Sequence, residues 1–246
     1  MRKYLIAAVA ALTALCFTAV AFGQGAALDV AVKKTKAGTK QKPKDSTLRL
    51  EIANEDFTQT ASRIEIWLGK TVILDHRGAK KKCSIATLSS GGPNACPAAS
   101  RIGKGSATAR AGVNLTRPPG QEPPVLPFSL TAFQTGKKSI AFYLDQTNGD
   151  IVAVAPGKLS KASGKYGTKI DVAIPEEPAQ QYPAGVYNGL EKIDVTIGST
   201  KKGKSVIKTV GCTKKKHNFK STIHFVNNPV PPKAAKVPAT ATSKCS

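Results

Sequence analysis

Short segments in which apolar and polar residues alternate recur along the chain, and this pattern constrains its fold most. Residues 28–32 (Leu-Asp-Val-Ala-Val) and 48–52 (Leu-Arg-Leu-Glu-Ile) are the clearest examples. Alternation of this kind, bounded by Gly, Pro, Asn and Lys, is typical of β-strands that bury one face. Helical periodicity is absent after the N-terminal region. We therefore predict further strands at 64–68, 108–113, 126–133, 140–144, 151–155, 169–174, 193–197, 206–210 and 219–226.

Ten or more short strands predict an all-β protein, an antiparallel β-sandwich of immunoglobulin-like or jelly-roll-like character. We expect hairpin turns at 135–138 and 200–204, and a type I′ turn at Asn148-Gly149, in which both central residues need positive φ. The proline-rich connector at 115–125 either divides two sub-domains or is a loop, and we expect a single unit spanning 24–246. Residues 227–246, rich in Pro, Ala and Lys, are expected to form a tail.

The N-terminus has the parts of a secretory signal peptide. Arg2 and Lys3 precede an apolar run that ends in small residues around Ala21. We predict that residues 1–23 are a signal peptide that is removed, with cleavage after Ala21 or at a position up to Gly25. A membrane anchor is the alternative, but no cluster of charges follows the apolar run closely. We therefore expect a secreted or cell-envelope protein with no transmembrane segment after cleavage.

The cysteines agree with export. Of five in the sequence, Cys16 lies in the signal peptide, which leaves an even number in the mature chain. An even number in an exported protein indicates disulfides. Four cysteines allow three pairings, and we expect the local one, Cys83–Cys96 and Cys212–Cys245. A zinc site is disfavoured because C-x-x-C is absent and the three histidines lack ligand spacing, so we expect no metal and no cofactor.

The segments CSIATL at 83–88 and CPAASRIGKGSA at 96–107 resemble a group of uncharacterised exported β-sandwich proteins of actinobacteria. In that group a C-S-x-x-x-L segment precedes C-P-x-x-S-x-I-G-x-G-x-A. The resemblance implies a secreted β-sandwich with both bridges closed locally, and it implies no activity. The residues themselves suggest a structural role, since Gly103 and Gly105 permit bulged or positive-φ backbone where a strand begins.

Groups that could carry catalysis are sparse. The chain lacks the motifs G-x-S-x-G and H-E-x-x-H and the nucleotide-binding fingerprints. Asp75-His76 is an adjacent acid–base pair, and Glu55-Asp56 and Glu176-Glu177 are carboxylate pairs in loops. Residues 145–150 (DQTNGD) resemble part of a calcium loop but lack the distal Glu, so we expect a hairpin turn there. We predict that the protein is not an enzyme.

Two further features have a structural and a functional interpretation. His217 and His224 are seven residues apart, which on a strand places them on opposite faces, where they cannot share a metal. Trp67, the one tryptophan, is out of phase with Ile64 and Ile66. We expect a core or inter-strand role for Trp67, and stacking on a sugar ring is the alternative.

The excess of positive charge is the feature of the sequence that most strongly indicates a function. The formal net charge is +22, or +20 without Arg2 and Lys3, and most of the basic residues are lysine. Such a field attracts polyanions in a salt-dependent way. Lysines cluster at 33–44 and 80–82. The densest cluster comprises Lys201, Lys202, Lys204, Lys208, Lys214, Lys215, Lys216 and Lys220. Within this cluster, the residues that we predict to bind a polyanion are Lys201, Lys202, Lys204, Lys214, Lys215 and Lys216.

Three functions fit the sequence. The first is a non-enzymatic secreted or cell-envelope protein that binds anionic cell-wall polymers or acidic glycans through its lysine-rich loops. Specific nucleic-acid binding is not expected, because arginines and aromatic residues are few. The second is a secreted hydrolase acting on glycans or esters. The third is a structural module without a specific ligand, whose lysines only block pairing between sheet edges.

Overall fold

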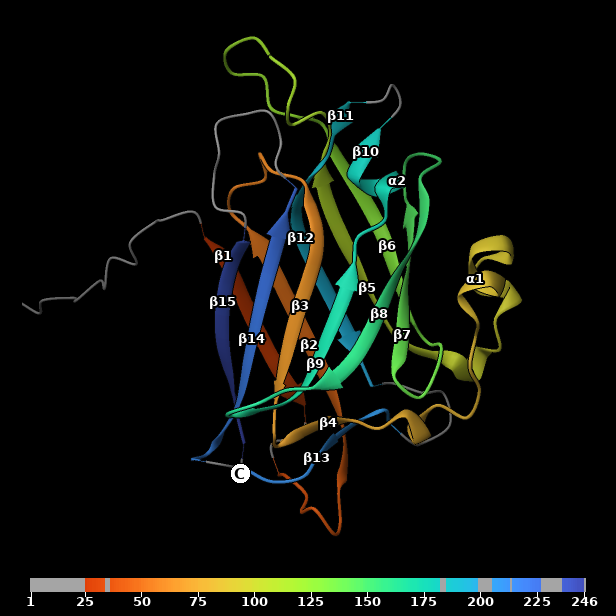
Figure 1. The fold of residues 1–246 in the computed structure, drawn as a ribbon, viewed down its shortest axis with the longest axis vertical. Coiled ribbons are helices and arrows are strands. Elements are labelled where there is room, and N and C mark those ends of the chain that lie inside the picture. Colours follow the sequence, from red (N-terminus) through yellow and green to blue (C-terminus); the bar gives the residue numbers. More distant parts are fainter. Residues whose placement is uncertain are drawn as a thin grey trace, which may run out of the picture.

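The chain forms one antiparallel sheet of 13 strands in a computed structural model that describes residues 25–33, 36–181, 185–198, 205–212, 214–226 and 236–245 (Figure 1). Its order is β15-β14-β3-β9-β8-β7-β6-β5-β12-β2-β13-β4, and β1 pairs with β2. The strands are β1 (Ala26–Lys33), β2 (Lys44–Asn54), β3 (Ala61–Gly69), β4 (Val72–Leu74), β5 (Arg101–Arg110), β6 (Val125–Gln134), β7 (Ser139–Gln146), β8 (Val152–Lys161), β9 (Tyr166–Ala173), β12 (Gly189–Ile197), β13 (Ile207–Thr209), β14 (Lys216–Phe225) and β15 (Lys236–Lys244). Outside this sheet are the helices α1 (Ile85–Gly91) and α2 (Glu176–Ala179) and the short pair β10 (Gln180–Gln181) and β11 (Val186–Tyr187).

The first and last strands lie side by side and bring the two edges of the sheet together (Figure 1). The Val32 amide donates a hydrogen bond to Ser243 Oγ at 3.0 Å, and Val30 packs in the same core as Val237. The sheet therefore curves until its edges meet, and its two halves enclose the core. The predicted all-β antiparallel class is confirmed, and the two layers of the expected sandwich are halves of one continuous sheet.

The alternation seen in the sequence decides which side chains form the core. In β2, Leu48, Leu50 and Ile52 are at most 2 % exposed, whereas the residues between them face outward. Burial of each such side chain contributes about 1.5–3 kcal/mol to folding. Phe133 and Phe219 are the largest of the fully buried side chains among the described residues.

Most predicted strands are present, with differences at their ends. The strand predicted at 108–113 begins earlier, because β5 starts at Arg101 and runs through Gly103 and Gly105. The tail predicted at 227–246 is a strand from Lys236 to Lys244. On either side of the 115–125 connector, β5 and β6 pair with each other. The hairpin predicted at 200–204 and the signal peptide lie outside the described residues.

The turn predictions had mixed outcomes. The connection between β6 and β7 falls at 135–138 as predicted. The type I′ turn at Asn148-Gly149 is wrong, since neither residue has positive φ. The connection between β7 and β8 is instead the five-residue segment 147–151. A hydrogen bond from Gln146 N, at the end of β7, to Ile151 O closes it.

Residues 83–100 contain a short helix that the sequence did not predict. Ser84 caps α1, because its Oγ accepts a hydrogen bond from Thr87 N at 3.0 Å. Gly92, at φ 64°, ends the helix and donates to Leu88 O. Leu88 is buried in a cluster that includes Phe133 of the sheet. The Cys83–Cys96 bridge closes this segment, and both predicted disulfides are present.

Candidate functional site: the basic end and its outer groove

Antiparallel pairing gathers most described lysines at one end of the curled sheet. Lys33 at the end of β1 lies opposite Thr47 of β2, and Lys216 at the start of β14 lies opposite Lys244 of β15. Strands β4 and β13 are at this end too, at the bottom of Figure 1. We call it the basic end. Its lysines are Lys33, Lys36, Lys40, Lys42, Lys44, Lys70, Lys80, Lys81, Lys82, Lys137, Lys138, Lys161, Lys165, Lys208, Lys214, Lys215, Lys216 and Lys244.

The carboxylates are distributed in the opposite way. At the far end of the sheet, which we call the acidic end, the described carboxylates are Glu55, Asp56, Glu122, Asp145, Asp150, Glu176 and Glu191. The basic end has Asp45 and Asp75 among its described residues, and both are in ion pairs. Asp45 binds Lys208 at 2.6 Å and Asp75 binds Arg77 at 2.9 Å. The remaining lysines of the basic end therefore keep a concentrated positive field.

Part of the predicted lysine cluster forms an exposed turn at this end. Lys201, Lys202 and Lys204 lie outside the described residues, whereas Lys214 and Lys215 are exposed at φ 53° and 57°. Two successive residues with side chains in this left-handed region are strained, at about 1–2 kcal/mol each.

The Cys212–Cys245 bridge and a neighbouring hydrogen bond hold the strained lysine turn. The Cys245 amide donates to Lys215 O at 3.1 Å, one residue before β14 begins. The disulfide therefore fixes both the last strand and the backbone that presents the lysines.

His217 follows this turn and faces the core, while His224 faces outward. The predicted placement on opposite faces is confirmed. His217 is fully buried, its Nδ1 lies 2.7 Å from Thr71 Oγ1, and its Nε2 has no hydrogen-bond partner among the described residues. His224 Nε2 lies 2.7 Å from Glu65 Oε2. Burial lowers the pKa of His217, because a charged imidazole would lose its hydration.

We expect the free energy of unfolding to fall between pH 7.5 and pH 5.5. The pKa of His217 is lower in the folded than in the unfolded protein, so the unfolded state binds more protons as the pH falls through about 6.5. Asp171 also has a lowered pKa, but its contribution is lost only below its ordinary value of 3.8, outside this window. Urea denaturation of His217→Phe should show most of this dependence gone, with His76→Gln as control. An unchanged dependence in His217→Phe would contradict the assignment.

An outer groove of about 850 Å³ leads from the basic end over β2, β12, β5 and β6. Its floor has three hydroxyl side chains, Ser106, Thr131 and Thr196. Its cations are Lys33, Arg49, Arg101 and Lys104.

Arg49 differs from the other cations of the groove, because acids neutralise it. It donates to Asp194 Oδ2 at 2.6 Å and to Glu51 Oε2 at 2.7 Å. The free positive charge in the groove therefore comes from Lys33, Lys104 and Arg101. Lys33 belongs to the lysine cluster at 33–44 that the sequence showed. Sequence reasoning missed Arg101 and Lys104, because they are single positions on β5 rather than members of a charge run.

The candidate catalytic residues do not converge. The Asp75 carboxylate binds Arg77 rather than His76, and its pKa is lowered because hydrogen bonds from Arg77 outweigh the opposing effect of burial. Glu55-Asp56 lies at the acidic end. Glu176 begins α2, and the side chain of Glu177 is outside the described residues.

Glu65 is the most buried of the described carboxylates on the outer face, and three basic side chains surround it. Lys169 Nζ, Arg63 Nη2 and His224 Nε2 each lie 2.7–2.8 Å from its oxygens. Burial opposes its ionisation, but the hydrogen bonds from Lys169 and His224 outweigh this effect and lower the pKa of Glu65. A carboxylate held ionised in this way suits an ion network better than a general acid, which needs a raised pKa.

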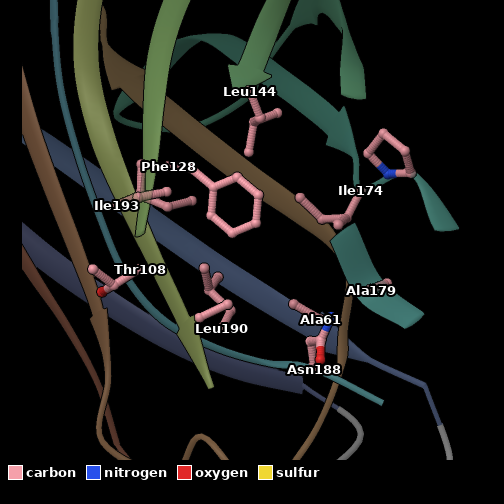
Figure 2. Close-up of a pocket in the computed structure, with 12 residues that line it drawn as sticks. Ala61, Thr108, Phe128, Leu144, Ile174, Ala179, Asn188, Leu190 and Ile193 are labelled. Atoms are coloured by element: carbon pink, nitrogen blue, oxygen red, sulfur yellow. The ribbon is translucent and has the colours of Figure 1, made fainter. Parts of the chain in front are cut away.

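Two small apolar cavities of about 50 Å³ each lie inside the sheet. Figure 2 shows Phe128, Leu190 and Ile193 converging on one of them, with Ala179 of α2 at its side. The two cavities share Leu144, Ile174 and Ile193 in their linings, so they adjoin. Both are far below the 300–1,000 Å³ of ordinary ligand pockets. Neither has a titratable side chain in its lining, so we place the candidate site on the basic end and its outer groove.

Comparison of the chain with models of protein families, with curated proteins and with solved structures gave no match. Within the part of the chain that the structure describes, no helix has the length and apolar character needed to cross a membrane. The two disulfides are compatible with an oxidising compartment.

Proposed function

We propose that this is a non-enzymatic, exported protein whose basic end attaches it to anionic polymers of the cell surface, such as cell-wall polymers or acidic glycans. The observation that carries the proposal is the separation of charge between the two ends of the sheet. Lysines from eight chain segments, far apart in sequence, meet at one end, while seven described carboxylates lie at the other.

Charge separation of this kind orients the molecule in the field of a polyanion. A surface rich in lysines displaces counterions from the polymer, which gives binding that weakens steeply with salt. The acidic end is repelled, so the basic end faces the polymer. The outer groove gives an extended chain a path away from this end, past Arg101 and Lys104.

The strained turn supports the same function. Asn and Gly are the residues that tolerate a left-handed backbone, yet Lys214 and Lys215 occupy it here. Strain that the surrounding structure maintains is often found at functional sites. Lysine at both positions costs stability and adds charge to the basic end.

The other two hypotheses have less support. A hydrolase needs a nucleophile and a base within hydrogen-bond reach, and His217, His224 and Asp75 lie in three different environments. A structural module would be compatible with lysines scattered over the surface as solubilising groups, whereas most of the described lysines gather at one end.

The double substitution Lys214→Asn/Lys215→Asn should weaken polyanion binding and leave the fold as stable as before, or more stable. Each lysine near an anionic surface contributes about 1 kcal/mol, so affinity should fall about 30-fold. Asn relieves strain at both positions, so the two effects have opposite signs. The measurement is salt-titrated binding of residues 24–246, with both bridges formed, to polyphosphate beads and to insoluble cell-wall material, alongside urea denaturation.

The matched control removes the same charge far from the basic end. Lys192 pairs with Ala53 and Lys236 with His224, both toward the acidic end. Lys192→Gln/Lys236→Gln should change the affinity less than threefold if position matters rather than net charge. Equal losses in the two variants, or no binding of the wild type at about 0.15 M salt, would refute the proposal.

A further inference from the structure

Trp67 lies on the outer face of the sheet, so of the expected core or inter-strand role the core part is wrong, while its contacts do run between strands. Its neighbours in β3, Ile66 and Leu68, are buried, while Trp67 is partly exposed. The residues directly across from it are lysines, Lys220 on β14 and Lys169 on β9. The one tryptophan of the chain therefore lies between two cations on a surface that faces solvent.

The two lysines are held differently. Lys169 Nζ lies 5.9 Å from the centre of the Trp67 ring and also binds Glu65 at 2.8 Å and Asp171 at 3.5 Å. Lys220 Nζ lies closer to the ring, at 4.6 Å, and no carboxylate among the described residues is within ion-pair distance of it. Lys169 is thus fixed by acids, whereas Lys220 retains its charge for an external partner.

The indole ring and the free ammonium suit one class of ligand. The π face of tryptophan is negative and apolar, and it attracts the weakly positive C–H face of a pyranose ring. A carboxylate on that sugar would be a natural partner for Lys220, whose flexible stem lets the ammonium move off the ring. We propose that the outer face around Trp67 binds the uronic acid units of an acidic glycan, an inference that rests on the polyanion binding proposed above.

The position of Trp67 connects this face to the basic end. β3 ends at Gly69, two residues beyond Trp67, or about 7 Å along the strand. Lys70 follows directly, and Lys161 and Lys165 lie at the adjoining ends of β8 and β9. A glycan held by the basic end can therefore extend along the side of the sheet to Trp67.

A single-stranded nucleic acid is the other polyanion that carries rings able to stack. Proteins that bind it place successive bases on successive aromatic side chains and use arginine for added stacking. The positions directly across from Trp67 on both neighbouring strands hold lysines rather than a second aromatic residue. The surroundings of Trp67 therefore favour a glycan over a nucleic acid.

The fluorescence of Trp67 gives a direct test, because no other tryptophan contributes to the emission. The full mature chain is titrated with an oligogalacturonate, a neutral gluco-oligosaccharide, polyphosphate and an oligodeoxythymidylate. We expect the oligogalacturonate to shift or quench the emission, and polyphosphate to bind without this change. By calorimetry, Trp67→Leu should weaken oligogalacturonate binding about tenfold. Trp67→Phe, which keeps an aromatic face, should retain most of the wild-type affinity for the oligogalacturonate.

One further variant and the four ligands together separate the outcomes. Lys220→Gln should lower the preference for the oligogalacturonate over the neutral oligosaccharide, while unfolding temperatures show that the variants are folded. If polyphosphate binds but the oligogalacturonate neither changes the emission nor responds to Trp67→Leu, the site is overturned and the function of the basic end survives. A larger emission change with the oligodeoxythymidylate would also overturn it. If neither polyphosphate nor the oligogalacturonate binds, the proposed function is refuted, and the site around Trp67 with it.

Discussion

Serine at both Cys212 and Cys245 should lower the free energy of unfolding by about 4 kcal/mol, from the entropy of the 33-residue loop that the bridge closes. The effect should be large because β15 is the last strand and pairs with β14 alone, apart from its contact with β1. For a chain of this length, the unfolding temperature should fall by about 10 °C. Thermal and urea unfolding of the oxidised double variant measure both quantities.

The other bridge provides the control. Cys83–Cys96 closes a loop of 13 residues, for which the same model gives about 3 kcal/mol. Loss of Cys212–Cys245 should also weaken polyphosphate binding, because the bridge holds the backbone of Lys214 and Lys215. Loss of Cys83–Cys96 leaves that turn intact. If the two variants bind polyphosphate equally, the bridge does not position the lysine turn.

The fold class followed from the sequence because strand alternation is a local signal. Leu48, Leu50 and Ile52 are apolar in steps of two, and the structure buries all three. The curvature that joins β1 to β15 is not local, since it depends on how the twist of every strand accumulates. Helix α1 was missed because a seven-residue helix has too few turns to show a period, although Ser84 is a recognisable cap.

Only part of the basic end was predicted, although the charges of the connections between strands indicate it in the sequence. Connections along the chain alternate in charge: 36–44 and 135–138 are rich in lysine, whereas 55–56 and 145–150 contain acids. Antiparallel strands send successive connections to opposite ends, so this alternation implies two ends of opposite charge. The lysines of 214–216 were found as a charge run. The groove cations on strands required the pairing of β2, β12 and β5, which sequence alone does not give.

The role of the glycines in β5 could not be predicted from the local sequence, because it depends on the neighbouring strand. Gly103 and Gly105 were expected to serve bulged or left-handed backbone, and the register does shift between Arg101 and Gly103. Neither glycine has positive φ. Their role is spatial: a Cβ at Gly105 would lie 2.0 Å from Asp194 O and 2.8 Å from Val195 Cα of β12. The close approach of β5 to β12 therefore requires glycine there.

Gly105→Ala should consequently cost about 4 kcal/mol, at the upper end of single substitutions. The obstructing atoms belong to the backbone of β12, so the two strands must separate and their hydrogen bonds, worth about 1 kcal/mol each, must weaken together. Gly211→Ala is the matched control, since its Cβ would meet only Thr71 Cγ2, at 3.7 Å, and should change stability by less than about 0.5 kcal/mol. Urea denaturation compares the two. A cost below about 1 kcal/mol for Gly105→Ala would mean that β5 and β12 are not packed this closely, and that the floor of the outer groove is shaped differently.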